Sequence, residues 1–202
     1  KQSFEDFEIK FYNVLTEVKV KINDKLVKSM TRELEQGHFA MTLPSLKRGD
    51  ERKYAFKLID IILGGNTSSR LYQKIREDMG LAYYVFSISD SFEEVGFWGV
   101  QSGVKLERLD EAVSVVRDEL RRLGQEGIKE EELDRAKDYM EGKTKLAMDR
   151  SSYWASFMGT KMLLENEIGD LDKELKKGRE VSLVEVNNLV KDVFKEEEIR
   201  LV

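Results

Sequence analysis

The sequence predicts an α+β domain, in which a mixed, mostly antiparallel β-sheet carries helices packed on one face. Residues 81–89 and 96–104 are two apolar runs joined by a short polar stretch, which is typical of an antiparallel hairpin. After Val104 the apolar residues recur at helical intervals until the closing run IRLV, which favours a final strand. No linker rich in Pro, Gly or Ser divides the 202 residues. We therefore predict one domain over residues 34–202, preceded by an extension or inter-domain connection over residues 1–33.

The chain begins with a predicted helix and two predicted strands. Phenylalanines recur at intervals of three and four within residues 4–17, as on one face of a helix. Residues 18–24 start with alternating apolar and basic residues, which is typical of a half-buried strand. A further strand is expected around residues 37–43, ended by Pro44.

Two helices are predicted to meet at a pair of glycines. Asp50 is a candidate cap for a helix over residues 51–63, whose apolar face repeats every three or four residues. Gly64 and Gly65 are expected to end this helix, because glycine tolerates the left-handed conformation. One of residues 66–68 then caps a helix that runs to about residue 79, and Gly80 ends it.

The remainder of the chain is predicted to be helical. Leucines and valines mark a helix from residue 109 that ends within residues 124–127, and acidic residues open a second helix after residue 128. Further helices are expected over residues 151–164 and after Asp170. Ser182 is the expected cap of the last helix.

The composition excludes several classes of function. The net charge of −5 comes from interspersed acids and bases, so no basic nucleic-acid-binding face is expected. No apolar run approaches the roughly 20 residues of a membrane span. The absence of cysteine excludes disulfides and thiolate zinc sites and suits a cytoplasmic protein. Because the sequence opens on Lys1 rather than Met, we expect its natural start to be missing.

Histidine occurs once, at His38. A Ser-His-Asp site would have to use it, and a metal site with several histidines cannot form in this chain. His38 is flanked by Phe39 and Met41 on a predicted strand, so we interpret it as a structural or half-exposed residue.

The glycine pair at Gly64 and Gly65 raises the alternative of a phosphate-binding loop. The pattern G-x-x-x-x-G-K-[ST] requires a preceding strand and a lysine, and the dinucleotide pattern requires G-x-G-x-x-G. Neither is present here, since a helix precedes Gly64 and no lysine follows at the required offset. A corner between two helices is the favoured interpretation, and nucleotide binding is the weaker hypothesis.

Taken whole, residues 63–85 carry a more specific signal, LGGNTSSRLYQKIREDMGLAYYV. This stretch resembles the C-terminal domain of the insulinase, pitrilysin and mitochondrial-processing-peptidase family of zinc metallopeptidases. The family pattern there is about L-G-G-x-x-S-S-R-L-x-x-x-I-R-E-x-x-G-L-A-Y. The likeness extends over residues 34–202, through the preceding strand and helix, the helical segment and the closing helix and strand.

The resemblance implies a split active site. In this family two homologous α+β halves face each other around a chamber, and one half holds zinc with H-x-x-E-H. This chain lacks that motif, so it resembles the other, non-zinc half and should be inactive alone. The implied partner is a homologous zinc-bearing half, on the same polypeptide or as the other subunit of a heterodimer. The assembly would cleave peptides or unfolded segments, with zinc held by the partner.

The resemblance assigns catalytic and substrate-binding roles to Arg76 and Tyr83, seven residues apart. Arg76 would donate to a substrate carbonyl, and Tyr83 to the substrate backbone or the developing oxyanion. The residues allow this pairing, because Gly80 reverses the chain and brings the start of the next strand back to the end of the Arg76 helix. Tyr84 is expected on the opposite side of that strand. The remaining polar matches, Ser68, Ser69 and Arg70, are interpreted as structural.

A second hypothesis stays open. The chain could be a catalytically inactive scaffold or binding subunit of the same family. The presence of both Arg76 and Tyr83 favours the peptidase half, since a scaffold has no need of the pair.

Overall fold

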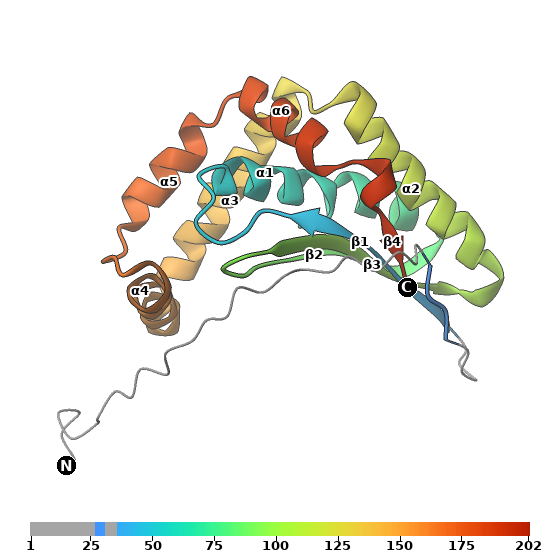
Figure 1. The fold of residues 1–202 in the computed structure, drawn as a ribbon, viewed down its shortest axis with the longest axis horizontal. Helices are drawn as coiled ribbons and strands as arrows, with labels where there is room; N and C mark the ends of the chain where they lie inside the picture. The colour runs from blue at the N-terminus through green and yellow to red at the C-terminus, as the bar shows by residue number, and fades with distance from the viewer. Residues whose placement is uncertain (1–26, 31–35) are drawn as a thin grey trace, which may run out of the picture.

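The computed structural model describes residues 27–30 and 36–202 (Figure 1). Their sheet has four antiparallel strands in the order β2-β3-β1-β4. Beyond β4, Val27 forms a parallel bridge with Leu201. The helix predicted over residues 4–17 and the strand over 18–24 lie outside the described residues. The strands are β1 (Gln36–Ser45), β2 (Ala82–Ser91), β3 (Gly96–Lys105) and β4 (Arg200–Leu201).

The helices confirm the predicted α+β class. Figure 1 shows α1, α2 and α6 gathered on one side of the sheet. Short helical turns, η2 (Tyr72–Asp78), η3 (Leu106–Arg108) and η4 (Glu196–Glu198), join the longer elements. The α-helices are α1 (Lys53–Leu63), α2 (Leu109–Glu126), α3 (Glu130–Met148), α4 (Ser151–Glu165), α5 (Leu171–Glu180) and α6 (Leu183–Val193).

The core lies between the sheet and these helices. Alternation along the strands sends every second side chain to the helical side. On β3, Trp98 and Val100 are fully buried there. The indole Nε1 of Trp98 donates to Asp60 Oδ1 at 2.8 Å, which satisfies the one polar atom of this ring. Leu58 and Ile59 of α1 are also fully buried, so the α1–sheet contact is the centre of the core.

Pro44 lies within β1 and does not end it, contrary to the prediction. Ala40 exchanges backbone hydrogen bonds with Val202, so even-numbered residues of β1 direct their N–H groups toward β4. The β4 pairing reaches only Met41 and Thr42. At Pro44 the missing N–H therefore faces the unpaired side of the strand, where proline costs no ladder hydrogen bond.

The predicted caps are partly confirmed. Ser182 Oγ accepts the N–H of Glu185 at 3.2 Å and caps α6 as expected. Asp50 Oδ1 accepts the N–H of Arg52 at 2.9 Å, but the helix begins at Lys53, two residues later than predicted. Asn66 Oδ1 accepts the N–H of Ser68 at 2.7 Å and opens the turn into the next helix.

Gly64 ends α1 for a different reason from the one predicted. Its φ is −151°, so it does not adopt the left-handed conformation. A Cβ at Gly64 would lie 2.7 Å from the backbone nitrogen of Ser87, whose N–H donates to the Gly64 carbonyl at 3.2 Å. The glycine is needed because α1 and the edge strand β2 approach each other closely at this point.

We expect Gly64→Ala to destabilise the fold by about 1–3 kcal/mol, the cost of overpacking, because the obstacle is backbone. Gly142→Ala is the matched control, since a Cβ there meets nothing within 4 Å and the residue lies inside α3. Alanine should leave that helix unchanged or slightly more stable. Thermal unfolding of both variants measures the difference. Equal melting temperatures would show that β2 moves away at little cost.

Candidate substrate-binding site

Arg76 lies in the helical turn η2, which has π-helical hydrogen bonding. The N–H of Met79 donates to the carbonyl of Lys74, five residues back, at 3.2 Å. Ile75 is fully buried and holds the turn against the core, whereas Arg76 is exposed. Single π-helical turns are rare and often occur at functional sites.

Gly80 then reverses the chain, as predicted. Its φ is +57°, which an L-residue adopts at a cost. The N–H of Leu81 donates to the Ile75 carbonyl at 2.8 Å, and the buried Leu81 side chain fixes the turn in the core. The start of β2 is thereby held beside the end of η2.

This turn brings Arg76 and Tyr83 into contact. Arg76 Nη1 donates to the backbone carbonyl of Tyr83. The guanidinium carbon also lies 5.3 Å from the centre of the Tyr72 ring, a cation–π arrangement that orients the side chain. The two predicted site residues therefore meet through the Tyr83 backbone, and the Tyr83 phenol is left for other partners.

Tyr83 is the extra residue of a β-bulge. Ala82 pairs with Val104 and Tyr84 with Gly103, so two steps on β2 match one step on β3. The Tyr83 side chain is 47% exposed, and its hydroxyl makes no hydrogen bond to another described residue. Bulges redirect side chains and occur next to active sites. The simple alternation that placed Tyr84 opposite Tyr83 does not apply across a bulge, and that orientation stays a prediction.

His38 and Tyr84 form a pair that sequence reasoning missed. A hydrogen bond of 3.0 Å joins the Tyr84 hydroxyl and His38 Nδ1, and both side chains are reached by solvent. His38 lies on β1 and Tyr84 on β2, with β3 between them. Because this contact crosses a strand and joins residues 46 apart, local sequence gave no sign of it.

Arg70 is placed as a structural residue. It donates to both carboxylate oxygens of Glu132 at 2.6 Å and to the Gly127 carbonyl at 2.9 Å. Burial by itself would raise the pKa of Glu132, but hydrogen bonds from Arg70 and from the Lys129 N–H outweigh it and lower the pKa. This bridge ties the η2 corner to α3. Of the serines in the motif, Ser69 is buried and Ser68 is exposed.

The alternative of a phosphate-binding loop finds no support in the geometry. Ser87 fills the space beside Gly64, so no phosphate fits against that glycine. Within residues 27–30 and 36–202, no group of three or more His, Cys, Asp or Glu side chains is arranged to hold a metal ion. One histidine and no cysteine do not fit a zinc site.

Comparison with known proteins identifies the family. A sequence profile described as the peptidase M16 inactive domain matches residues 4–140, more than half of the chain. This chain belongs to the M16 peptidase family, inactive-domain type. The family predicted from residues 63–85 is confirmed. The matched range begins inside residues 1–33, and the predicted division after residue 33 stays a prediction.

Relatives and solved structures agree with this M16 assignment. An uncharacterized zinc protease of Streptomyces coelicolor is 32% identical over 168 residues, which are 83% of this chain and 37% of the relative. The M16 inactive domain from Pseudomonas fluorescens has the same fold, with a TM-score of 0.75 at 20% identity, over 83% of this chain and 40% of that one. The inactive peptidase domain of a putative zinc protease from Bordetella parapertussis also has this fold, with a TM-score of 0.71 at 16% identity. The match covers 87% of this chain and 95% of that one. This M16 chain spans about two fifths of the length of the first two curated relatives.

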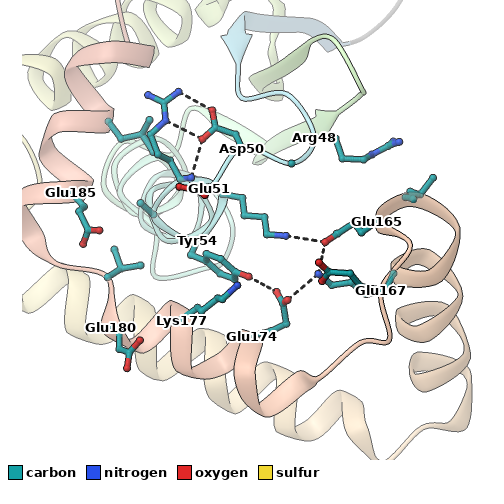
Figure 2. Close-up of a pocket in the computed structure, with 18 of the residues that line it drawn as sticks. Arg48, Asp50, Glu51, Tyr54, Glu165, Glu167, Glu174, Lys177, Glu180 and Glu185 are labelled. Atoms are coloured by element: carbon teal, nitrogen blue, oxygen red, sulfur yellow. Dashed lines mark hydrogen bonds and ion pairs between the residues drawn. The ribbon is translucent and has the colours of Figure 1, made fainter. Parts of the chain in front are cut away.

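The M16 domain also has a cavity of about 1260 Å³, lined by residues of α1, α4, α5 and α6 and by the loop that precedes α1 (Figure 2). Lys161 is buried here and pairs with Glu165 at 2.6 Å and Glu174 at 2.9 Å. Figure 2 shows Tyr54 pointing at Glu174, to which its hydroxyl donates at 2.9 Å.

Both Lys161 and Tyr54 have a raised pKa in this cavity. Burial disfavours the charged ammonium, but the two glutamates outweigh it and raise the pKa of Lys161. Burial, reinforced by Glu174, raises the pKa of Tyr54. Because each of these groups already has a partner, we assign the network to fastening α4 and α5 onto α1.

No helix in the described part of the M16 domain combines the length and apolar character that crossing a membrane requires.

Proposed function

We propose that this M16 domain is the non-zinc half of a zinc metalloendopeptidase. In this proposal Arg76 and Tyr83 bind the peptide at the active site of a homologous zinc-bearing half. The observation that carries the proposal is the contact between Arg76 and Tyr83 at the π-helical turn, with Tyr83 itself exposed. Family membership supports the assembly, and the absence of cysteine supports the cytoplasm as its compartment.

Each of the two residues has a distinct role. The Arg76 guanidinium has five donors, so it can bind a peptide carbonyl while keeping its bond to Tyr83. The Tyr83 phenol donates to the peptide backbone or to the oxyanion that develops on it. In the assembly, the H-x-x-E-H motif of the partner half would hold zinc, which would supply an activated water. The partner is on the same polypeptide or is the other subunit of a heterodimer.

One observation favours the alternative of a scaffold subunit. The Arg76 guanidinium is already bonded within the chain, to the Tyr83 carbonyl, and a purely structural arginine would make the same contact. A scaffold would bind the zinc-bearing half without contributing to cleavage.

The test is to mix this chain with a separately expressed M16 half that carries H-x-x-E-H, and to follow cleavage of a quenched fluorescent peptide. We expect chelator-sensitive cleavage in the mixture and none from either component. Arg76→Gln should reduce it at least about 10-fold, the cost of a lost charge-assisted hydrogen bond. Arg117→Gln, an exposed arginine of α2, is the matched control and should have no effect. If the halves associate without cleavage, the scaffold alternative holds.

A further inference from the structure

The face of the sheet opposite the core carries few charges. Its side chains include four rows of residues paired across β1, β3 and β2, and among these only Asp90 has a formal charge, although 36% of the whole chain is charged. Lys105, paired with Gln36, and Arg200, paired with Thr42, lie at the margins of the same face. The rows are His38, Gly103 and Tyr84; Ala40, Gln101 and Phe86; Thr42, Gly99 and Ile88; and Pro44, Phe97 and Asp90.

So few charges are unusual on the outer face of an antiparallel sheet that meets water, where polar side chains normally alternate with buried ones. Here Phe86 is 42% exposed and Phe97 is 36% exposed. The helices that bury the core, α1, α2, α3 and α6, lie on the other face. Exposed aromatic residues on a contiguous face indicate a binding surface.

Three side chains at one end of this face form what we call the aromatic platform: His38, Tyr84 and Phe86. The Tyr84 and His38 rings stack with centroids 6.1 Å apart, and the Tyr84 and Phe86 centroids are 5.5 Å apart. Gly103 makes this possible, because a Cβ at that position would overlap the Tyr84 ring. The Tyr84 ring thus lies across β3, and its hydrogen bond to His38 fixes it there.

The platform is continuous with the proposed peptide site. Tyr84 follows Tyr83 directly, and Phe86 is two residues further along the same strand. An extended peptide advances about 3.3 Å per residue, so a residue close to the one that Arg76 and Tyr83 hold can reach the platform. None of the three platform side chains is an acid, a lysine or an arginine. An apolar or aromatic side chain therefore binds there, whereas a charged side chain that covers the rings loses hydration without an ionic partner in the platform.

We propose that the aromatic platform is a specificity subsite for an aromatic or large apolar side chain of the peptide that Arg76 and Tyr83 hold. This inference rests on the proposed function and adds the class of peptide that the site selects. Phe86 supplies an exposed ring for stacking, and the hydrogen-bonded Tyr84 supplies a rigid floor.

The test compares three peptides that differ at a single residue near the cleavage point, carrying Phe, Ser or Lys. The assembled peptidase should cleave the Phe peptide with the highest kcat/KM. Phe86→Ser should lower kcat/KM for the Phe peptide about 10-fold and leave the Ser peptide unchanged, because only the apolar side chain uses the ring. Leu163→Ser is the matched control, since this leucine is 84% exposed on α4 and far from the platform in sequence.

A second measurement needs no catalysis. Titrating this chain with the Phe peptide should shift the NMR resonances of Phe86 and Tyr84, and the Ser peptide should shift them much less. If Phe86→Ser lowers kcat/KM equally for all three peptides, the proposed subsite is wrong. It is also wrong if the Phe and Ser peptides shift the NMR resonances equally. A dimer of this chain that Phe86→Ser dissociates would also overturn it, because the face would then bind a second copy. If Arg76→Gln leaves cleavage unchanged while Phe86→Ser changes selectivity, the Arg76 role fails and the subsite stands.

Discussion

Tyr83→Phe in the assembled peptidase is expected to lower kcat about 100-fold or more and to change KM little. Removing one donor that serves the developing oxyanion typically costs a factor of 10² to 10³. The ring of phenylalanine fills the same space, and the lost hydroxyl makes no hydrogen bond to another described residue. The bulge geometry and the Arg76 bond to the Tyr83 carbonyl should therefore survive the substitution, because both depend on the backbone. Steady-state kinetics on a fluorescent peptide measures the two constants separately.

Tyr139→Phe is the matched control for this experiment. Tyr139 is 37% exposed on α3 and lies under Lys143, so losing its hydroxyl should leave both constants unchanged. Unfolding curves for both variants should coincide with that of the parent chain. An unchanged kcat for Tyr83→Phe would remove the phenol from the mechanism. A higher KM with unchanged kcat would assign it to ground-state binding alone.

Local sequence predicted most of the fold because most of the elements depend on local signals. The apolar periodicity of α2, the acidic first turn of α3, the Ser182 cap of α6 and the hairpin of β2 and β3 were all visible in short windows. Gly80 likewise predicted the chain reversal that brings Arg76 toward Tyr83. Where the prediction was wrong, the cause is a distant neighbour. Gly64 is small because Ser87 approaches it, and Pro44 is tolerated because β4 stops short of it.

The candidate site was likewise predictable from the sequence only in part. Spacing and the family pattern located Arg76 and Tyr83, but neither the π-helical turn nor the bulge has a sequence signal of its own. Both are local shifts of the hydrogen-bond register, and they depend on how η2 and β2 pack against the rest of the fold. The buried Lys161 was missed as well, because its partner Glu174 and the further member Tyr54 lie on other helices. Long-range polar pairs of this kind are found only in the folded structure.

Arg70→Met is expected to cost roughly 2 kcal/mol of folding stability, less than breaking a fully buried ion pair, because both partners keep some contact with solvent. The Arg70 side chain is only 12% exposed and Glu132 17%, and both hydrogen bonds between them are short. Methionine keeps most of the aliphatic volume but leaves Glu132 buried without its cation. Urea denaturation at neutral pH measures the loss. Arg121→Met, which breaks a bridge between exposed partners, is the matched control and should change stability little.

The pH dependence of this loss identifies the cause. In the parent chain the pKa of Glu132 lies below its ordinary value of 4.5. The ionised Glu132 therefore contributes its full stabilisation above pH 4.5, and this contribution is lost as the pH falls through the lowered pKa of the folded state. In Arg70→Met the bridge is gone and burial remains, so the pKa of Glu132 should rise, and protonation should then relieve the buried charge. The stability difference between the two proteins should therefore shrink as the pH is lowered from 7 toward 4. A difference that stays constant over this range would mean that Arg70 stabilises the corner by packing or by its bond to the Gly127 carbonyl, and that the charge of Glu132 plays no part.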